Sequence, residues 1–574
     1  MTLLYNDPAR FTEDALRGFC ELHANRVRAV PGGVVRSTPT PDAKVAVVIG
    51  GGSGHYPAFS GLVGPGFADG AVVGNIFTAP SAQQVHAVAE AAHSGGGVLL
   101  GYGNYAGDVM NFGAAQDRLR TEGIDCRTIV VTDDLASNED ANQRRGIAGD
   151  FAVFKIASAA AEEGMSLREV EHLARRANAR TRSLGVAFDG CTLPGQHEPL
   201  FTVPEGRMAL GLGIHGEPGI SEVDMPAADE VADTLVDGVL TEAGDGDSSR
   251  VAVILNGLGA TKHEEMFVLW SRIAAKLRAA GLTLVAPEVG ELVTSLDMSG
   301  VSLTLVRLDE ELERLWRAPA DTPAYRKIGG DEATPARTPT TEAGGAATGE
   351  TYPEADHESR ECAATIAAVF HEIRRTVEDH AEELGRIDAI AADGDHGRGM
   401  LKGTTAAARA AELAHEAGAG AHSLLLRAAE AWEAEAGGTS GALWGAGLRS
   451  LAAALSDRGR PDQADLAGGV ESFSASIERL GGAEVGDKTM LDALAPFTDT
   501  FGRTHSWREA AAAARTGAEG TAELAARTGR AKHLAERGLG TPDAGAVSFA
   551  LIAETVAEVL RPRNEHPQRE NTHE

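Results

Sequence analysis

An acidic cluster lies between two helical patterns in the C-terminal half of the chain. The segment "GRIDAIAADGDHGRGM" carries Asp388, Asp393 and Asp395, followed at once by glycines. Crowded carboxylates repel one another unless cations neutralise them, and Mg²⁺ prefers such oxygen ligands and also binds nucleotide phosphates. A solvated acidic loop fits the spacing alone equally well. The cluster is therefore a candidate site for a metal ion and a triphosphate.

Glycine-containing loops in the same half favour the nucleotide interpretation. They are "AGGTSGALWG" at 436–445, "VGDKTMLDAL" at 485–494 and "TPDAGAV" at 541–547, and each opens onto a helical pattern. The free N–H groups at a helix N-terminus bind anions. Several such openings facing one acidic loop would make a nucleotide pocket. Arg530 would then offset charge on the transferred phosphoryl group, although alone it fits a surface residue better.

A different glycine loop follows a strand pattern near the N-terminus, in "VVIGGGSGHYPAFSG" at 47–61. Consecutive glycines expose backbone N–H groups that can hold phosphate or sugar hydroxyls. The ATP-binding P-loop requires a lysine after its last glycine, whereas His55 and Tyr56 follow Gly54 here. The loop is therefore not a P-loop.

A histidine between glycines and a separate aspartate suggest a site for a polyhydroxy ligand. His215 lies in "GIHGEPG", where Glu217 can fix the ring tautomer and leave one nitrogen free as a nucleophile. Asp108 follows a strand pattern, where a carboxylate can accept a hydroxyl proton during phosphoryl transfer. A lone histidine would fit a structural role better, but His55 and Asp108 strengthen the functional interpretation.

The patterns that must position these residues divide the chain. From residue 45 to about 310, β-branched runs alternate with helical stretches, which predicts an α/β domain over 1–330. Residues 331–355 are rich in Gly, Pro, Thr and Ala and predict a flexible linker. Over 356–562, apolar residues recur at three- and four-residue spacing, which predicts a helical domain. Residues 563–574 form a polar tail.

Composition narrows the classes of function. The 574 residues carry a net charge of −31, which argues against nucleic acid and anionic membranes as partners. No apolar run reaches the roughly 18 residues of a membrane span, and the N-terminus lacks a signal-peptide pattern, so we expect a cytoplasmic protein. The four cysteines form no Cys-x-x-Cys pair, which indicates neither a disulfide framework nor a thiolate metal site.

In order along the chain, the motifs resemble those of the ATP-dependent dihydroxyacetone kinases, which fuse a ketose-binding domain to a helical ATP-binding domain. The matching motifs are "GGGSGH", "NYAGD", "RRGIAG", "GIHGEPG", "DGDHG", "GGTSGAL", "GDKTM", "GRA" and "PDAG". The resemblance spans nearly the whole chain. It implies two α/β subdomains within 1–330, an eight-helix antiparallel barrel within 356–562, and a homodimer.

The resemblance also implies an activity and a set of site residues. A ketone carbonyl would be held on His215 as a hemiaminal, which admits ketoses and rejects glycerol, and His55 and Asp108 would complete the catalytic set. Two Mg²⁺ ions would bind Asp388, Asp393 and Asp395, with ATP as co-substrate. The implied ketose-binding residues are Gly52, Ser53, Gly54, His55, Tyr56, Gly103 and Asp108. The implied ATP-binding residues are His396, Gly397, Arg398, Gly399, Thr439, Ser440, Gly486, Arg530, Asp543, Ala544 and Gly545.

Departures from the family pattern bear on the substrate. Tyr56, Phe59 and Gly103 stand where dihydroxyacetone kinases usually have Glu, His and Lys. The missing lysine side chain would free space, and the Tyr56 hydroxyl would bind an extra substrate hydroxyl. We therefore expect D-erythrulose to be phosphorylated at its C4 hydroxyl. Dihydroxyacetone (glycerone) and L-erythrulose stay open as substrates, as do a non-catalytic ketose sensor, a fatty-acid kinase-like acceptor and a flavin-cyclising side activity.

Overall fold

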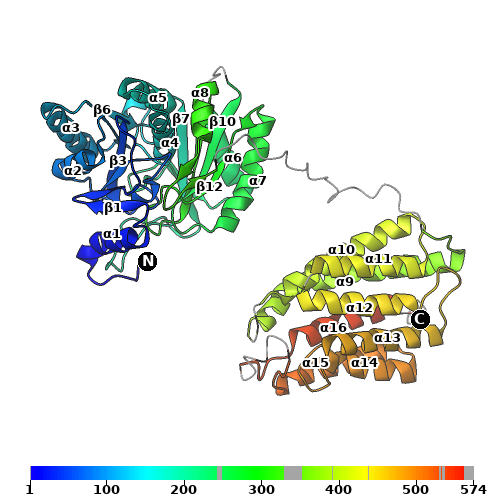
Figure 1. Cartoon of the computed structure of the whole chain (residues 1–574). Coiled ribbons are helices and arrows are strands. Elements are labelled where there is room, and N and C mark those ends of the chain that lie inside the picture. The colour runs from blue at the N-terminus through cyan, green and yellow to red at the C-terminus, as the bar shows by residue number, and fades with distance from the viewer. Residues whose placement is uncertain are drawn as a thin grey trace, which may run out of the picture. The chain divides into compact units, whose positions relative to one another are not determined.

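Two units make up the chain, Met1–Ala336 and Arg337–Glu574 (Figure 1). The computed structural model describes residues 2–241, 248–328, 352–390, 392, 394–436, 438–528, 532 and 537–561. The predicted tail over 563–574 lies outside the described residues, as does all of the predicted linker except residues 352–355.

The first sheet of the N-terminal unit carries the glycine loop. Within the described residues it has six strands, and its strands β3 to β6 run parallel to one another. Polar residues at the carboxyl ends of such strands meet at one edge of the sheet. The glycine loop leaves β3 there, and the segment that leads to Asp108 leaves β5. In sheet order the strands are β1 (Val27–Val30), β2 (Gly33–Arg36), β4 (Gly70–Ile76), β3 (Ala46–Ser53), β5 (Val98–Gly103) and β6 (Cys126–Val131).

A second, largely antiparallel sheet carries His215 in the connection between β8 and β9. It confirms that the N-terminal unit contains two α/β subdomains. Its strands are β11 (Thr283–Leu284), β10 (Arg250–Gly257), β13 (Gly300–Arg307), β7 (Thr181–Ala187), β8 (Arg207–Leu210) and β9 (Ser221–Asp224), with β12 (Glu288–Gly290) beside β10. A short ribbon pairs β14 (Ala320–Asp321) with β15 (Arg326–Lys327).

One helix joins the two sheets into a common core. Nearly every side chain of α4 (Gly149–Glu162) is buried, and the helix contacts β3 of the first sheet and β7 and β13 of the second. Its run of alanines lets both sheets approach closely, which holds their loops at a fixed separation. The other helices of this unit are α1 (Phe11–Leu22), α2 (Ala82–Ala92), α3 (Ala106–Thr121), α5 (Leu167–Ala179), α6 (Ala228–Thr241), α7 (His263–Ala279) and α8 (Glu310–Arg317).

The C-terminal unit is a closed ring of helices, as the resemblance implies. Eight α-helices occur within its described residues; each packs on the next, and the last packs on the first. The connections from α9 through α15 are short and make these helices antiparallel neighbours, whereas residues 521–543 separate α15 from α16 (Figure 1). They are α9 (His357–Asp388), α10 (His396–Glu416), α11 (Ala421–Ala436), α12 (Gly438–Ala453), α13 (Gln463–Gly481), α14 (Leu491–Thr504), α15 (Trp507–Gly520) and α16 (Ala544–Val559).

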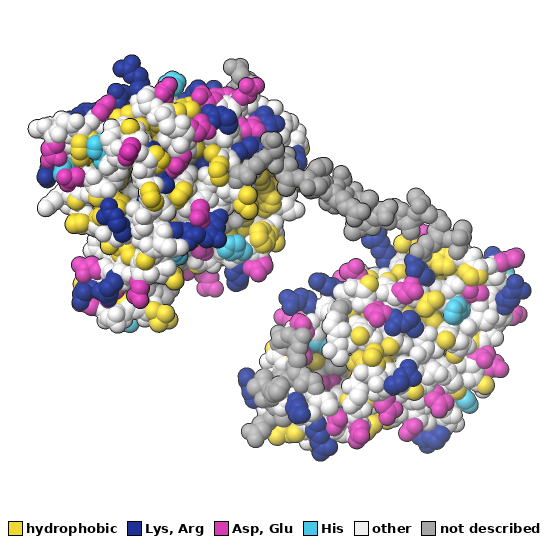
Figure 2. All heavy atoms as spheres, in the orientation of Figure 1, with side chains coloured by type: hydrophobic (Ala, Val, Ile, Leu, Met, Phe, Trp, Pro, Cys, Tyr) yellow, Lys and Arg dark blue, Asp and Glu magenta, His cyan; other side chains and the backbone are white. Residues whose placement is uncertain are grey.

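The surface of the units carries charges of both signs, and the C-terminal unit contains an apolar cavity. Acidic and basic side chains intermix on the face drawn in Figure 2. None of the helices in the described parts has the length and apolar character of a membrane span. The ring of helices encloses an apolar cavity of about 760 Å³, lined by stacked Trp432 and Trp444 among other side chains.

Candidate active site

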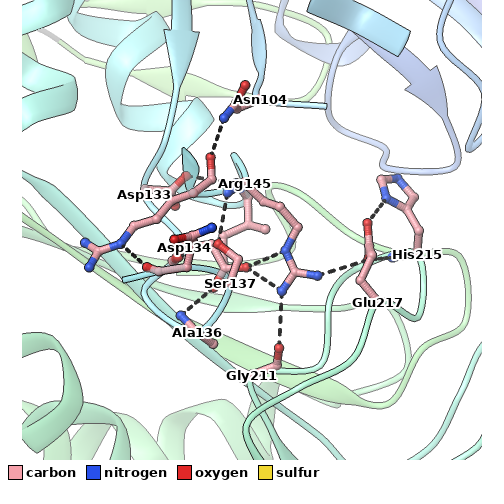
Figure 3. A network of polar contacts seen from close by, with 12 residues as sticks. Asn104, Asp133, Asp134, Ala136, Ser137, Arg145, Gly211, His215 and Glu217 are labelled. Atoms are coloured by element: carbon pink, nitrogen blue, oxygen red, sulfur yellow. Dashed lines mark hydrogen bonds and ion pairs between the residues drawn. The ribbon is translucent and has the colours of Figure 1, made fainter. Parts of the chain in front are cut away.

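The loop between β8 and β9 fixes the His215 ring against a carboxylate. The Nδ1 atom of His215 lies 2.9 Å from Oε1 of Glu217, and the His215 backbone N–H donates to Oε2 at 3.0 Å. A Cβ atom on Gly213 would lie 2.1 Å from Oε2 of Glu217, so only glycine admits this arrangement. Because a carboxylate accepts hydrogen bonds, Nδ1 carries a hydrogen and Nε2 faces away from Glu217 (Figure 3).

His55 meets His215 through the Nε2 atoms of the two rings, which lie 3.1 Å apart. The Nδ1 atom of His55 lies 2.7 Å from the carbonyl oxygen of Thr294 and therefore also carries a hydrogen. A hydrogen bond between the facing Nε2 atoms then requires one shared proton. Burial, together with the neighbouring His215, lowers the pKa of His55 to about 3, so His55 is uncharged at neutral pH.

Aromatic side chains surround the histidine pair and limit its access to water. The ring of Phe77 stacks on His55 at a centroid distance of 5.1 Å and meets His215 edge-on at 5.0 Å. Tyr105 meets His215 edge-on at 4.9 Å, and its buried hydroxyl has no partner among the described residues. A reacting group on His215 would therefore lie in low-dielectric surroundings.

Asp108 lies in the first turn of α3 beside the glycine loop. A Cβ atom on Gly51 would lie 3.7 Å from Oδ1 of Asp108, and this oxygen is buried without a partner among the described residues. Burial raises the pKa of Asp108 to about 6, against the opposing effect of His215. An unpartnered carboxylate with such a pKa suits proton abstraction near neutral pH.

The glycine loop borders a cavity of about 470 Å³ on its other side. Gly52, Ser53, Gly54 and Tyr56 line this cavity together with α1. His55, Asp108 and His215 are not part of this lining, and both His55 and Asp108 are buried. The structure thus divides the predicted ketose-binding residues between a cavity and a buried polar centre next to it.

The three residues that depart from the family pattern, Tyr56, Phe59 and Gly103, lie in surroundings that differ from our expectation. A Cβ atom on Gly103 would lie 3.2 Å from the Tyr105 ring and 3.3 Å from Oδ2 of Asp150, so protein atoms fill the space that we expected to be free. Tyr56 is half exposed, and its ring packs edge-on against Phe19 of α1 at 6.1 Å. Phe59 is buried, 6.4 Å from the ring of Phe154.

Sequence reasoning missed an arginine that braces the His215 loop. The guanidinium of Arg145 lies 2.9 Å from Oδ2 of Asp134 and 3.6 Å from Oε2 of Glu217, and it donates to the carbonyl of Gly211 (Figure 3). The motif "RRGIAG" contains this residue, but no sequence pattern indicates that its side chain reaches the loop of Glu217, far along the chain. Arg145 limits the movement of Glu217 relative to His215.

The C-terminal unit contains a polar pocket of about 570 Å³. The N-terminal ends of α10, α12, α14 and α16 contribute to its walls, as the glycine loops predicted. Unpaired N–H groups at the N-terminal ends of helices can bind phosphate. The predicted residues in its lining are Asp388, Asp395, His396, Arg398, Gly399, Thr439, Ser440, Asp543, Ala544 and Gly545.

The other predicted nucleotide residues differ in position. Gly397 packs against α9, where a Cβ atom would lie 1.9 Å from the carbonyl oxygen of Ala381. Gly486 donates its N–H to Oδ1 of Asp492 and is not part of the pocket lining. Asp393 and Arg530 lie outside the described residues.

The carboxylates of the pocket have the donor type that Mg²⁺ requires. Asp388 and Asp395 both line the pocket beside the start of α10, and oxygen ligands together with phosphate oxygens are the usual surroundings of Mg²⁺. The described residues alone contain no cluster of three or more such side chains. The metal triad therefore stays a prediction, because Asp393 is its third member.

Comparisons with known proteins cover both units. Residues 17–324 match the Dak1 domain and residues 390–558 match the DAK2 domain. The D-erythrulose kinase of Mycolicibacterium smegmatis is 58% identical over 98% of this chain and 99% of its own length. The L-erythrulose kinase of Pectobacterium atrosepticum is 52% identical over 98% of this chain and 97% of its own length. The crystal structure of the dihydroxyacetone kinase from C. freundii with AMP-PNP and Mg²⁺ is 30% identical, with a TM-score of 0.58, over 97% of this chain and 99% of that one.

Proposed function

The chain belongs to the dihydroxyacetone kinase family, in which a Dak1 domain is joined to a DAK2 domain, and on that premise we propose that it phosphorylates erythrulose with ATP. It is a phosphotransferase that acts on an alcohol group. The similarity to two erythrulose kinases over almost the whole chain supports the four-carbon substrate. The buried, unpartnered Oδ1 atom of Asp108, whose pKa responds to the charge of His215, supports this chemistry.

We propose D-erythrulose as the preferred enantiomer and the C4 hydroxyl as the acceptor. A D-erythrulose kinase is 58% identical to this chain, whereas an L-erythrulose kinase and an L-erythrulose 1-kinase are 52% and 53% identical, which supports the D form by a modest difference. L-erythrulose and dihydroxyacetone are the alternatives. The packing of Tyr56 and Phe59 against protein side chains favours neither enantiomer.

His215 captures the ketone in this proposal. The Nε2 lone pair forms a bond to the carbonyl carbon, the carbonyl π electrons move to oxygen, and that oxygen takes a proton to give a hemiaminal. The proton shared between His215 and His55 must leave Nε2 before the attack, and the same proton can neutralise the new alkoxide. Glycerol has no carbonyl group and is therefore rejected.

Asp108 accepts the proton of the terminal hydroxyl as that oxygen attacks the γ-phosphorus of ATP. The bond from this phosphorus to the bridging oxygen breaks, and ADP leaves. A pKa of about 6 keeps Asp108 ionised at neutral pH while leaving it basic enough to accept a proton. Glu217 and Arg145 keep the bound ketose in place by holding His215.

The pocket of the C-terminal unit binds the nucleotide in this proposal. Asp388 and Asp395, with Asp393, would hold Mg²⁺, which supplies positive charge to the phosphates when bound. The AMP-PNP and Mg²⁺ complex of the C. freundii relative supports this use, and the resemblance implies two ions.

We also propose a homodimer. Apolar side chains exposed at Ile220, Val223 and Met225, on and beside edge strand β9, support a protein contact there.

A coupled ADP-release assay tests the proposal. The substrates are both enantiomers of erythrulose, dihydroxyacetone, a five-carbon ketose and glycerol, each with saturating ATP and Mg²⁺. We expect the highest kcat/KM for D-erythrulose, some turnover of dihydroxyacetone, and none of glycerol. Because one methylene group changes binding by only about 1–3 kcal/mol, specificity constants must be compared. A preference for dihydroxyacetone of about tenfold over both erythrulose enantiomers would contradict the proposed substrate.

A further inference from the structure

Lys488, in the loop before α14, is buried with its ammonium group among backbone carbonyl oxygens. Its Nζ atom lies 2.9 Å from the oxygen of Thr521, 3.1 Å from that of Leu524, 2.8 Å from that of Gly538 and 2.7 Å from that of Thr541. An ammonium group has three hydrogens, so these acceptors already exceed its donors. The oxygens therefore surround the group in the way that ligands surround a bound cation.

The charge of Lys488 is balanced by carbonyl dipoles. In the described parts of the chain, no carboxylate lies within ion-pair distance of its Nζ atom, and the residue is only 6% exposed. Carbonyl oxygens arranged around a monovalent cation also form the K⁺ sites of selective channels. We call the oxygens of Thr521, Leu524, Gly538 and Thr541 the carbonyl cage.

The side chain cannot serve as a phosphate ligand while it occupies the cage, although Lys488 borders the nucleotide pocket. All of its donors are used by the carbonyl oxygens. The backbone around it is also fixed, because Asp492 accepts hydrogen bonds from the N–H groups of Gly486 and Thr489. Lys488 itself has a φ of 63°, an angle that a lysine rarely adopts without such constraints.

The cage joins segments that carry pocket residues. Lys488 precedes Thr489, Met490 and Leu491, which line the pocket at the start of α14. On the cage side, the Thr521 hydroxyl accepts a hydrogen bond at 2.8 Å from the backbone N–H of Asp543, which caps α16. Loss of the ammonium group would therefore loosen the N-terminal ends of α14 and α16 together.

We propose that Lys488 is a positioning residue for the nucleotide, whose ammonium group acts as a built-in monovalent cation that holds the phosphate-binding ends of α14 and α16 in register. This inference rests on the proposed use of the pocket for ATP. It predicts that removal of the side chain leaves a carbonyl cage that NH₄⁺ or K⁺ can fill. ATP binding by the variant then depends on an added monovalent cation, which is not the case for the native chain.

The experiment compares the wild type, Lys488→Ala and the matched control Lys276→Ala, a lysine on α7 of the other unit. Each is assayed with NaCl, KCl or NH₄Cl at equal ionic strength, with KM for ATP, kcat and the ketose adduct as readouts. In Na⁺ we expect KM for ATP of Lys488→Ala to rise on the order of tenfold, while the adduct on the N-terminal unit forms normally. NH₄⁺ or K⁺ should recover most of that loss, and the other two proteins should show no cation dependence.

A second variant tests whether an added cation restores ATP binding by occupying the carbonyl cage. Lys488→Met keeps most of the length of the side chain and removes its charge, so we expect weak ATP binding that no cation restores. Equal recovery of the Ala and Met variants, or an unchanged KM of Lys488→Ala in Na⁺, would overturn the inference. Failure of Lys488→Ala to fold in NH₄Cl, seen by circular dichroism, would also overturn it and assign Lys488 to folding alone. Absence of ATP binding by the wild type would instead contradict the proposed function.

Discussion

At the residue scale, burial sets the charge of each group on the ketose side. Burial raises the pKa of Asp108 to about 6 and lowers that of His55 to about 3. Burial opposes ionisation of Glu217, but its hydrogen bond from His215 and the charge of that ring hold its pKa at about 2. At neutral pH the site therefore combines an ionised base, an uncharged His55 and a carboxylate that stays ionised over the working range.

The pKa of Asp108 predicts the acid limb of the pH profile. A base must be unprotonated to accept a proton, and the raised pKa means that Asp108 gains its proton as the pH falls through about 6. We expect log kcat/KM for erythrulose to fall with a slope of one below that pH. Asp108→Asn should lower kcat by about a hundredfold or more and abolish this limb. An unchanged limb in the Asn variant would assign it to another group.

Tyr56 gives a test of how the site selects its ketose. Its ring packs on Phe19 and half of the residue is exposed, so removal of its hydroxyl should leave the ketose site intact. We expect Tyr56→Phe to keep kcat/KM for D-erythrulose within about threefold of the wild type. A selective loss of about tenfold or more for erythrulose relative to dihydroxyacetone would show that this hydroxyl binds the extra substrate hydroxyl.

At the element scale, strand ends and helix starts place the functional groups. The glycine loop and Asp108 follow β3 and β5, and the N-terminal ends of α10, α12, α14 and α16 line the nucleotide pocket. Hydrophobic periodicity and glycine loops are local signals, so the sequence could predict these elements and their openings. Contacts from Arg145 to Glu217 and from Lys488 to the carbonyl oxygens of Thr521 and Thr541 join segments far apart in the chain, so no local sequence pattern predicts them.

The space beside Gly103 is another feature that could not be predicted from the sequence alone. The sequence reveals that a lysine is replaced by glycine, but only the folded chain shows that Tyr105 and Asp150 occupy the neighbouring space. The absence of a side chain is thus weak evidence for a larger pocket, because other residues can move into the gap.

The start of α10 carries a prediction about the metal. Asp395 lines the pocket at the N-terminal end of this helix. If it holds Mg²⁺, Asp395→Asn should lower turnover on the order of a hundredfold and raise the Mg²⁺ concentration needed for half-maximal rate. Erythrulose capture by His215 should be unaffected in this variant. Activity and Mg²⁺ dependence close to the wild type would contradict the metal assignment.

At the scale of the whole molecule, the chain assigns its chemistry to separate units. The N-terminal unit contains the proposed nucleophile and base, and the C-terminal unit contains the proposed nucleotide pocket. The division predicts that variants in one unit leave the binding step of the other unchanged. The adduct on His215 therefore serves as an internal control for every variant of the nucleotide pocket, and nucleotide binding serves the same purpose for variants of the ketose site.

In the proposed mechanism, phosphorylation requires a ketose bound covalently to His215. Intact-mass measurement after incubation with D-erythrulose, on the wild type and on His215→Ala, tests it most directly. A hemiaminal forms without loss of water, so we expect the wild type to gain the full mass of erythrulose, and His215→Ala to gain nothing and to lose about a hundredfold or more in kcat/KM for ADP release. An adduct of the same mass on folded His215→Ala, or wild-type turnover by that variant, would contradict covalent capture of the ketose by His215.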